Sequence, residues 1–475
     1  MSHSRDRLYV DGSWVASTGT ETLPVTNPYT EERIGTVPAG TAQDVDRAAT
    51  AAAAAFPSWS QTSRDDRVKY CTAIAEGLMA RQQEIALSAA TQMGAPWQLA
   101  VMVQAGLPAI SFASMQDVVR HVAWETTSGN SLLVRHPVGV VGAITPWNYP
   151  LHQIAAKVAP ALVAGCTVVV KPSELVPGVA YILAEVIDSA GLPPGVFNLV
   201  TGTGPEVGEA IVRHPAVDMV SFTGSTRAGR RVAELAAAAP KRVALELGGK
   251  SASILLDDLD TEGFAQALAG TLTGCLINSG QTCSALTRLL VPRSRLAEAE
   301  ELLAVFAQFA VLGDPLDPTT TTGPLVSEIQ RTRVRDYITL GLDEGATLVA
   351  GGVSPPLPRG YFVSPTVLSG VIPGMRIEQE EVFGPVLVVV PYDAGDDSAV
   401  AIANGTPYGL AGAVFGADKD RAMRVARQLR AGQVAVNGAA FNPTAPFGGF
   451  GQSGYGRELG PLGVEEFTAI SSLQC

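Results

Sequence analysis

The chain has 475 residues, of which 47% are hydrophobic, so it is long enough for about three domain-sized units with a large buried core. Its 33 basic and 45 acidic residues leave a net charge of −12, and it has no dense Lys/Arg run, so we expect no nucleic-acid partner. The longest uncharged run, residues 137–156, is interrupted by Pro146, Asn148, Pro150 and His152, which argues against a membrane helix.

The N-terminus begins with charged residues and continues into a hairpin-like stretch, which is unlike the apolar region of a signal peptide. Five cysteines at wide spacings fit a reducing compartment, and they form neither a CxxC pair nor a zinc pattern. The histidines are scattered and no HExxH motif is present, so we expect no metal site. These patterns predict a cytoplasmic protein that is not attached to a membrane.

The first part of the chain is predicted to be helical after a short N-terminal hairpin, with helices over 42–57, 64–92 and 97–118. Residues 121–136 are predicted to form a β-hairpin, because two strand-like runs flank the turn residues Ser128, Gly129 and Asn130. Together with the C-terminal tail, this hairpin is expected to contact another subunit.

From residue 138 to residue 246, apolar β-branched strands alternate with helices, which predicts a parallel sheet covered on both faces. The expected strands are 138–144, 167–170, 196–200, 218–222 and 242–246. A second α/β block runs from residue 251 to about residue 440. Its expected strands are 252–256, 286–292, 386–391, 411–416 and 432–437.

Cys283 and Glu246 are the candidate chemical pair. Cys283 lies in a small, polar loop that follows a predicted helix, a setting that exposes a reactive thiol. Glu246 ends a predicted strand and is followed closely by Gly248 and Gly249, which allow a sharp turn or the close approach of a ligand. A loop cysteine is most often simply a buried residue, so this pair does not by itself establish a function.

Two glycine-rich segments, 202–208 and 222–229, lie at strand-to-helix junctions where backbone N–H groups can bind a pyrophosphate. Neither matches the standard GxGxxG fingerprint, and each is a weak signal alone. They occur with four further motifs: TPWNYP (145–150), VKPSE (170–174), EEVFGP (380–385) and PFGG (446–449). With this set in order along nearly the whole chain, the sequence resembles the NAD(P)-dependent aldehyde dehydrogenases.

The resemblance implies an α/β fold with a Rossmann-like parallel-sheet cofactor domain, a second α/β catalytic domain and a small β oligomerisation element. The corresponding boundaries are 1–118 with 138–248 for the cofactor domain, 249–450 for the catalytic domain, and 119–137 with 451–475 for the oligomerisation hairpin and C-terminal arm. It also implies a homodimer or a homotetramer.

The implied reaction oxidises an aldehyde to a carboxylic acid with NAD as cofactor, NADP being the alternative, through a thiohemiacetal and a thioester on Cys283. In this resemblance Cys283 is the nucleophile and Glu246 the general base. Asn148 is the side-chain half of the oxyanion hole. Lys157 and Glu458 fall where the family often has a proton relay to the base.

The cofactor is expected to lie across both glycine-rich segments and the neighbouring strand ends. The residues implied in its binding are Ile144, Thr145, Pro146, Trp147, Lys171, Ser173, Glu174, Gly204, Gly208, Phe222, Thr223, Gly224, Ser225, Gly229, Leu247, Gly248, Glu381 and Phe383. Glu174 is expected to accept hydrogen bonds from the adenine-side ribose and to repel a 2′-phosphate, which favours NAD over NADP.

The substrate tunnel is expected to be wider or more polar than in enzymes for small aldehydes, because Gln153 and Ala156 stand where the family often has bulky apolar or aromatic residues. The residues implied in the tunnel are Gln153, Ala156, Ile277, Thr282, Ser284, Phe441 and Phe447. The sequence does not name the aldehyde.

Three other interpretations remain at this stage. A CoA-acylating enzyme of the same family generally lacks the base, so Glu246 argues against it. A catalytically silent structural relative is disfavoured because Cys283, Glu246 and Asn148 are all present. A cysteine hydrolase without a cofactor is disfavoured because no His motif accompanies Cys283.

Overall fold

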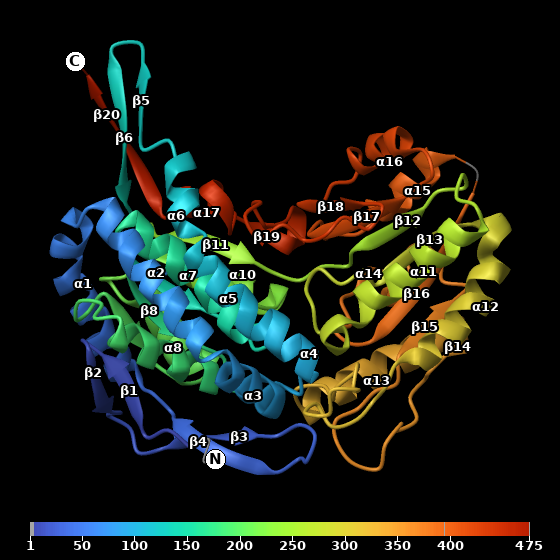
Figure 1. Ribbon diagram of the computed structural model, residues 1–475, viewed down its shortest axis with the longest axis horizontal. Coiled ribbons are helices and arrows are strands. Elements are labelled where there is room, and N and C mark those ends of the chain that lie inside the picture. The colour runs from blue at the N-terminus through green and yellow to red at the C-terminus, as the bar shows by residue number, and fades with distance from the viewer. Residues whose placement is uncertain (1–3, 394, 475) are drawn as a thin grey trace.

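The computed structural model describes residues 4–393 and 395–474 and shows two α/β units side by side, each built around a sheet (Figure 1). The first sheet has the strand order β19-β11-β10-β7-β8-β9-β1-β2. Its strands are β1 (Arg7–Val10), β2 (Ser13–Ala16), β7 (Val140–Ile144), β8 (Thr167–Lys171), β9 (Phe197–Leu199), β10 (Met219–Thr223), β11 (Arg242–Glu246) and β19 (Gly454–Tyr455). The strands from β7 to β11 are parallel, so their carboxyl ends share one edge.

Helices cover both faces of the first sheet, as the uniformly buried central strands require. Four helices share one apolar core on one face: α2 (Arg64–Ala80), α3 (Gln82–Met93), α7 (Pro150–Ala164) and α8 (Gly178–Ser189). Three helices pack on the other face: α1 (Ala42–Gln61), α9 (Glu209–Arg213) and α10 (Thr226–Ala236). A separate pair of strands, β3 (Thr22–Thr26) and β4 (Arg33–Pro38), lies at the edge of this unit.

Two of the predicted helices are divided in the structure. The segment predicted as one helix over 64–92 is α2 and α3, which meet at Arg81. The segment predicted as 97–118 contains α4 (Trp97–Leu99), a π-helical turn (Ala100–Ala105), α5 (Gly106–Ala113) and α6 (Met115–Val118). Apolar periodicity continues across such breaks, so sequence pattern alone does not reveal them.

By length and hydropathy the helical run Trp97–His121 is sufficient to cross a membrane, but half of its most apolar window is buried inside the fold. Its central helix α5 packs against α2 and α7. The core helix of a globular protein meets the same length and hydropathy criteria.

The second sheet has the strand order β14-β15-β16-β13-β12-β17-β18. Its strands are β12 (Ala252–Leu255), β13 (Arg288–Pro292), β14 (Thr347–Ala350), β15 (Thr366–Ser369), β16 (Val386–Tyr392), β17 (Ala411–Phe415) and β18 (Gln433–Val436). The sequence analysis missed β14 and β15. The helices α11 (Thr261–Leu276) and α12 (Leu296–Phe306) cover one face. The other face carries α13 (Glu328–Asp343), α14 (Arg376–Gln379), α15 (Asp396–Ala403) and α16 (Lys419–Ala426).

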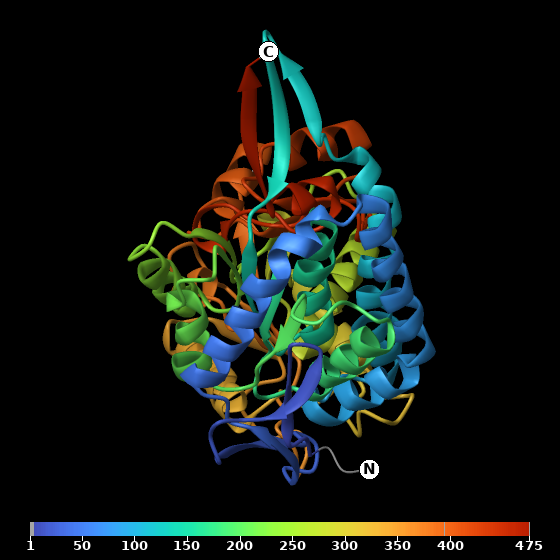
Figure 2. The same ribbon diagram turned by 90° about the vertical axis from the view of Figure 1, so that its left-hand side faces the viewer.

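A three-stranded sheet projects from the globule, as Figure 2 shows from the side. It joins the predicted hairpin, β5 (Glu125–Ser128) and β6 (Ser131–Pro137), to the C-terminal strand β20 (Thr468–Gln474). The sequence analysis treats 451–475 as one arm, whereas the structure divides it. Strand β19 pairs with β11, and α17 (Gly460–Glu465) packs on α7, so only β20 reaches the projecting sheet.

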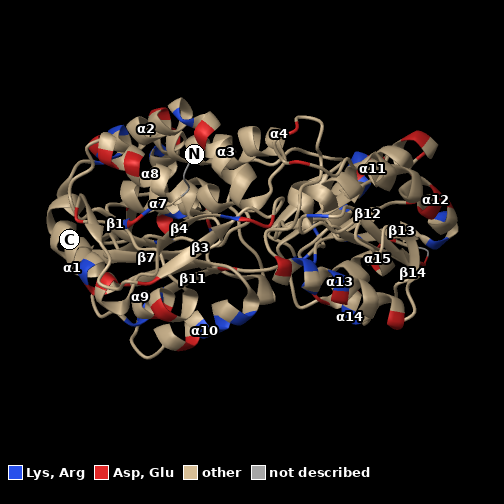
Figure 3. Cartoon of the chain, turned by 90° about the horizontal axis from the view of Figure 1, so that it is seen from below, with Lys and Arg blue, Asp and Glu red and all other residues tan. Residues whose placement is uncertain are grey.

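Acidic and basic residues are interspersed along the helices of both units in the view of Figure 3. This mixture fits the modest negative net charge and differs from the concentrated positive surface that nucleic-acid binding requires. The structure thus confirms the α/β class: a Rossmann-like parallel-sheet unit, a second α/β unit and a small β element.

Candidate active site

A cavity of about 230 Å3 lies between the two α/β units and contains the thiol of Cys283. Strand ends of the first sheet form one wall, while the segment before β16 and helix α13 form the other. The lining residues are Pro146, Trp147, Asn148, Thr223, Gly224, Ser225, Leu247, Gly248, Cys283, Gln330, Arg333, Glu381 and Phe383. Residues separated by more than 200 positions therefore meet here, because both sheets direct their loops toward the same space.

Cys283 lies in a loop that packs closely on Gly249. A Cβ on Gly249 would lie 2.6 Å from the Cys283 carbonyl oxygen, so the glycine permits this approach. Burial raises the pKa of the Cys283 thiol to about 12, and the nearby Glu381 and Glu246 carboxylates act in the same direction. The thiol is therefore protonated at neutral pH in the protein alone.

Asn148 is held rigidly at the start of α7. Its side-chain Nδ2 donates to the Gln281 carbonyl oxygen at 3.1 Å, so one of its two N–H groups is used and the other is free for a ligand. Its own carbonyl oxygen accepts hydrogen bonds from Gln104 Nε2 (3.1 Å) and Asn278 Nδ2 (2.9 Å). Such fixed donors suit the stabilisation of an oxyanion.

Glu246 ends β11 and is only 4% exposed. Neither of its carboxyl oxygens has a hydrogen-bond partner among the described residues. Burial raises the pKa of Glu246 well above its ordinary value, and the Glu458 carboxylate contributes in the same direction. A Cβ on Gly448 would lie 2.5 Å from Glu246 Oε1, so this glycine leaves space for the carboxyl group. The hydrogen-bonding capacity of this buried carboxyl group is therefore unused among the described residues.

Lys157 and Glu458 form a buried ion pair behind Glu246. The Lys157 ammonium also donates to Thr223 Oγ1 at 2.7 Å, and Thr223 is the register partner of Glu246 across β10 and β11. The chain segment of Glu458 pairs with that of Phe447 through two backbone hydrogen bonds. The structure thus brings the two expected relay residues next to the expected base.

The cofactor residues divide into three groups. Nine of them line the cavity: Pro146, Trp147, Thr223, Gly224, Ser225, Leu247, Gly248, Glu381 and Phe383. Lys171 Nζ contacts Glu174 Oε2 at 2.8 Å just after β8, with Ser173 between them in the chain. The others, Ile144, Thr145, Gly204, Gly208, Phe222 and Gly229, lie in the first unit outside the cavity lining.

The local geometry fits a bound dinucleotide. Ser225 caps the N-terminus of α10, where free backbone N–H groups favour a phosphate. A Cβ on Gly248 would lie 2.4 Å from Glu381 Oε2, so the glycine leaves space at the end of the cavity. The buried hydroxyl of Thr145 lacks a hydrogen-bond partner among the described residues. Burial raises the pKa of Glu381 to about 7.

Two cavity residues, Gln330 and Arg333, were missed by the sequence analysis. Gln330 Nε2 donates to the Phe383 carbonyl oxygen at 2.7 Å, and Arg333 Nη2 donates to the Glu381 carbonyl oxygen at 2.6 Å. From one face of α13, these two side chains hold the segment that contains Glu381 and Phe383, two of the expected cofactor residues. Their polar side chains in an ordinary surface helix give no sequence signal for this position.

Two of the expected substrate residues, Thr282 and Ser284, flank Cys283 in its loop. Tyr149 Oη and Thr282 Oγ1 share a hydrogen bond at 2.8 Å. Gln153 and Ala156 lie buried on α7. The rings of Phe441 and Phe447 meet edge to face with centroids 6.5 Å apart, whereas Ile277 is 38% exposed and Ser284 is half-buried. None of the seven expected residues lines the cavity that contains Cys283.

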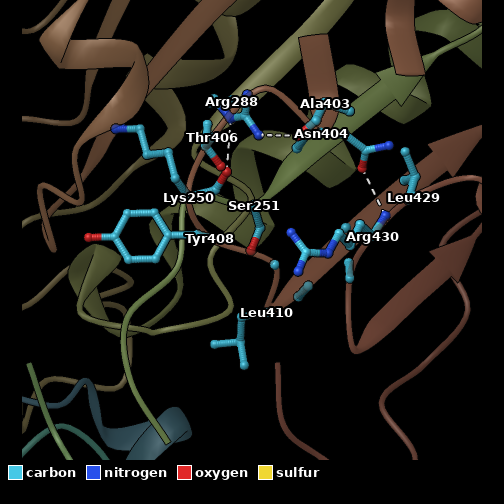
Figure 4. A pocket seen from close by; sticks show the side chains of 15 residues that line it. Lys250, Ser251, Arg288, Ala403, Asn404, Thr406, Tyr408, Leu410, Leu429 and Arg430 are labelled. Atoms are coloured by element: carbon cyan, nitrogen blue, oxygen red, sulfur yellow. Dashed lines mark hydrogen bonds between the residues drawn. The ribbon is translucent and has the colours of Figure 1, made fainter. Parts of the chain in front are cut away.

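A second, smaller pocket lies beside Gly249, around Lys250, Ser251 and Arg288 (Figure 4). The Arg288 guanidinium donates to Glu378 and to three backbone carbonyl oxygens. The Lys250 side chain points away from Arg288, and its buried ammonium lacks a partner among the described residues. Burial lowers the pKa of Lys250 to about 8.

Comparison with known proteins identifies the family. Residues 14–473 match the family model described as the aldehyde dehydrogenase family. The chain is 49% identical over 470 residues to a 3-succinoylsemialdehyde-pyridine dehydrogenase of a Pseudomonas species, with 98% of each chain covered.

Solved structures agree with this match. A mutant of aldehyde dehydrogenase C of Pseudomonas syringae, in complex with NAD+ and octanal, superposes with a TM-score of 0.97 at 47% identity, over 100% of this chain and 97% of the other. An aldehyde dehydrogenase of Mycobacterium tuberculosis in complex with NAD+ also has a TM-score of 0.97, at 41% identity, over 100% and 99% of the two chains. The chain therefore belongs to the aldehyde dehydrogenase family, and its activity is the NAD-dependent oxidation of an aldehyde.

Proposed function

We propose that this enzyme releases its product as a free carboxylic acid, by hydrolysis of a thioester formed on Cys283. The observation that carries the proposal is the state of Glu246: buried, without a hydrogen-bond partner and close enough to Cys283 to raise the pKa of the thiol. A carboxyl group left in this state has the capacity to accept a proton from water at neutral pH.

In the first half of the reaction, the sulfur of Cys283 forms a bond to the carbonyl carbon of the aldehyde, and the thiol proton is released to solvent. The free N–H of Asn148 Nδ2 and the backbone N–H of Cys283 stabilise the developing oxyanion. NAD, when bound, accepts the hydride that leaves this carbon. The carbonyl then re-forms, and the acyl group remains attached to Cys283 as a thioester.

In the second half, Glu246 takes a proton from water as the water oxygen attacks the thioester carbon, and the Cys283 sulfur leaves. The proton then passes from Glu246 toward the Lys157–Glu458 pair. The proximity of these charged groups to Glu246 supports this route. Lys157 and Glu458 are buried and bonded to each other, and Lys157 also donates to Thr223 Oγ1. The pair therefore serves as the proton relay.

A CoA-acylating reaction needs no hydrolytic base, so a buried Glu246 backed by an ion pair argues for hydrolysis. A silent structural role and a cofactor-free hydrolase are both disfavoured by the cavity, where Cys283 lies beside Glu381 and Phe383. Hydrolytic aldehyde oxidation is the proposal that uses all of these groups.

The test separates the two halves of the reaction by following NADH absorbance after mixing enzyme, NAD and aldehyde. Glu246→Gln should give a burst of up to one NADH per active site and then stall at the thioester. Cys283→Ala should give no burst, because no covalent adduct forms. Equal bursts from both variants would exclude Cys283 as the nucleophile, provided that both are folded and bind NAD.

Absence of a burst in folded, NAD-binding Glu246→Gln would assign the carboxylate to an earlier step, the deprotonation of the thiol. Mass spectrometry of the stalled Glu246→Gln enzyme should show the mass of the acyl group on the peptide that contains Cys283. An unmodified peptide after a complete burst would contradict the thioester.

Two further features belong to the proposal. The Glu174 carboxylate near Lys171 supports a preference for NAD over NADP, because it repels a 2′-phosphate.

The projecting sheet of β5, β6 and β20 supports a homodimer or homotetramer, since Ile470 and Leu473 on β20 are 57% and 49% exposed. Light scattering at micromolar concentration tests the assembly, and a fully active monomer would contradict it.

The predicted units also remain proposals: a cofactor domain over 1–118 and 138–248, a catalytic domain over 249–450, and an oligomerisation element over 119–137 and 451–475, within which β20 is the part that joins the projecting sheet. A cytoplasmic location is proposed from the cysteine usage. For the substrate, we propose an aldehyde bulkier than the smallest ones, because Ala156 replaces a larger residue in the expected tunnel. Relatives named for a pyridine semialdehyde and bound to octanal support that size.

A further inference from the structure

The two donors of the proposed oxyanion hole come from separate segments of the chain. Asn148 immediately precedes Tyr149 and α7 in the first unit, whereas Cys283 lies in the loop after α11 in the second unit. A displacement of about 1 Å in an active site lowers a rate by about 10²-fold. Contacts between the two segments must therefore fix the distance between the two donors.

Consecutive residues of the two segments are bonded to each other in order. Asn148 Nδ2 donates to the Gln281 carbonyl oxygen at 3.1 Å. The next residues along each segment, Tyr149 and Thr282, share a hydrogen bond between their hydroxyl groups at 2.8 Å. The Thr282 hydroxyl gives its single proton to the Ile277 carbonyl oxygen at 3.3 Å, so Tyr149 Oη is the donor to Thr282. We call the Asn148–Gln281 and Tyr149–Thr282 bonds the clamp.

The two bonds of the clamp differ in how well their surroundings support them. Gln281 is 1% exposed, and its side chain is fixed at both ends. Its Oε1 accepts from the Val326 N–H at 2.9 Å, and its Nε2 donates to the Asn278 carbonyl oxygen at 3.1 Å. Within the described residues, Thr282 has a side-chain hydrogen bond to the first unit only through Tyr149. The residue next to Cys283 is therefore held against α7 by one hydroxyl group.

The loop that carries Cys283 begins with a strained turn. Asn278 and Ser279 adopt left-handed backbone conformations, with φ of 53° and 56°. Residues other than glycine keep such conformations only where the surrounding contacts fix them. Because the Ile277 carbonyl oxygen before this turn accepts from the Thr282 hydroxyl, the bond from Tyr149 also supports the turn.

Tyr149 is built to act as a fixed donor. Its side chain is buried, and it is the residue that caps the N-terminus of α7. Its carbonyl oxygen accepts from the Gln153 N–H at 2.9 Å, so the helix holds the backbone that carries the ring. Burial raises the pKa of the Tyr149 hydroxyl, and the nearby Cys283 acts in the same direction. The hydroxyl group therefore keeps its proton at neutral pH.

We propose that Tyr149 is a positioning residue of the oxyanion hole, which acts through Thr282 to hold the Cys283 N–H at a fixed distance from Asn148. The inference rests on the proposed function, because it concerns the same oxyanion hole. Tyr149 does not line the cavity of Cys283, in agreement with a role through another residue. Loss of its hydroxyl should lower the rate of hydride transfer and leave aldehyde binding unchanged.

The test measures NADH formation in single turnovers, with saturating NAD and with enzyme in excess over hexanal. Varying the enzyme concentration separates the limiting rate constant from the half-saturating concentration. Tyr149→Phe should lower the limiting rate constant about fivefold to tenfold, a range that loss of one hydrogen bond accounts for. The half-saturating concentration should stay within about twofold of the wild-type value, because binding does not use the hydroxyl group.

A matched control lies elsewhere in the first unit. Tyr181 is also buried, and its hydroxyl group also pairs with a threonine hydroxyl, that of Thr201, at 3.5 Å. Tyr181→Phe therefore removes the same atom from the same kind of pair, and its limiting rate constant should equal that of the wild type. Thermal denaturation and NAD titration show whether each variant is folded and binds the cofactor.

Variants of Thr282 test the bond from its other side. Thr282→Val removes the acceptor and should slow hydride transfer about as much as Tyr149→Phe does. The double variant should be no slower than the slower single variant, because both changes remove the same bond. Thr282→Ser keeps a hydroxyl group at this position and should recover most of the rate that Thr282→Val loses. Multiplied effects in the double variant would overturn the inference.

The remaining outcomes separate this inference from the proposed function. An inactive Cys283→Ala enzyme together with equal limiting rate constants for Tyr149→Phe and Tyr181→Phe would overturn the positioning role alone. A raised half-saturating concentration with an unchanged limiting rate constant for Tyr149→Phe would also overturn it, because Tyr149 would then contact the aldehyde. NADH formation by Cys283→Ala at the wild-type rate would instead refute the thioester route.

Discussion

Two buried ion pairs in this protein differ in how completely their hydrogen bonds are satisfied. Arg288 and Glu378 in the second unit are 1% and 0% exposed, and Arg288 Nη1 contacts Glu378 Oε1 at 2.7 Å. Three further guanidinium N–H groups donate to the carbonyl oxygens of Lys250, Ile402 and Ala403, and Figure 4 labels Lys250 and Ala403 beside Arg288. Four of the five guanidinium N–H groups are used in this way, so the pair keeps little hydrogen-bonding capacity for a ligand.

Lys157 and Glu458 in the first unit are equally buried, but Glu246 lies next to them with both carboxyl oxygens unpartnered. A buried carboxyl group without partners destabilises a fold, so it persists where function requires it. The comparison teaches that burial and charge alone do not mark a catalytic group. Unused hydrogen-bonding capacity beside the pair distinguishes the candidate site from a structural pair.

Removing one charged side chain from each pair tests this contrast, and it is expected to have the largest effect. Arg288→Met leaves Glu378 buried without its partner, so the free energy of unfolding should fall by about 3–5 kcal/mol. The folded fraction should keep its turnover rate. Lys157→Met should also destabilise the protein, and in addition it should slow hydrolysis of the thioester while the NADH burst remains.

Urea denaturation measures the stability of both variants, and stopped-flow absorbance measures the burst. The double variant Arg288→Met with Glu378→Leu should recover much of the lost stability, because no charge remains unpaired in the core. A normal steady-state rate in folded Lys157→Met would show that the two pairs are equivalent and would remove Lys157 from the relay.

Asn148→Ala sharpens the comparison with a neutral group. The loss of a preorganised donor to an oxyanion lowers kcat by about 10²–10³. Asn404 in the second pocket is the matched control, since its side chain donates to the Gln428 carbonyl oxygen and accepts from the Arg430 N–H. Steady-state rates of both variants at saturating NAD check the expectation, and a kcat for Asn148→Ala within threefold of that for Asn404→Ala would contradict it.

The ion pair of Lys171 and Glu174 is less buried than the two pairs compared above, because its side chains are 5% and 36% exposed. Glu174→Gln removes the repulsion of a 2′-phosphate, so the ratio of kcat/KM for NADP to that for NAD should rise by about tenfold. The stability of the fold should change little, because the pair is partly solvated. An unchanged cofactor ratio would place the adenine-side ribose away from Glu174.

The smallest expected effect is the change in thermal stability caused by Glu246→Gln. Because burial raises the pKa of Glu246 in the folded protein, the folded state binds its proton more tightly than the unfolded chain does. Stability is therefore lost as pH rises from the unfolded pKa through the folded pKa. Gln remains neutral, so Glu246→Gln should raise Tm by about 1–4 °C at pH 8 and by less at pH 5.

Scanning calorimetry at the two pH values checks this difference, with Glu262→Gln on the exposed face of α11 as the control. A Tm difference for Glu246→Gln that is the same at pH 5 and pH 8 would show that the carboxyl group does not titrate in this range. Its role as a base near neutral pH would then be contradicted.

The order of strands and helices was largely predictable, because β-branched apolar runs and helical periodicity are local properties of the chain. All five predicted strands of the parallel sheet are present, from β7 to β11. The prediction missed β14 and β15 in the second sheet and the break between α2 and α3. Short edge strands carry little periodicity, and apolar spacing continues across a helix break.

The family motifs also led to the pairing of Cys283 with Glu246 and to most residues of the cavity. They did not lead to Gln330 and Arg333, which reach the cavity only because α13 packs beside the segment before β16. Nor did they indicate that the arm 451–475 divides between the first sheet and β20. Contacts between segments that are far apart in the sequence produce no periodic pattern in it, so sequence patterns do not predict them.

The sequence by itself determined the chemical groups: a thiol in a loop, a carboxylate at a strand end and an amide before a helix, each in a recognisable motif. Their chemistry follows from the side chains and needs no coordinates. Only the tertiary structure decided their state, because burial and neighbouring charges set the pKa of a group and depend on which surfaces pack together. The buried Glu246, whose carboxyl oxygens have no partner among the described residues, is a product of that packing.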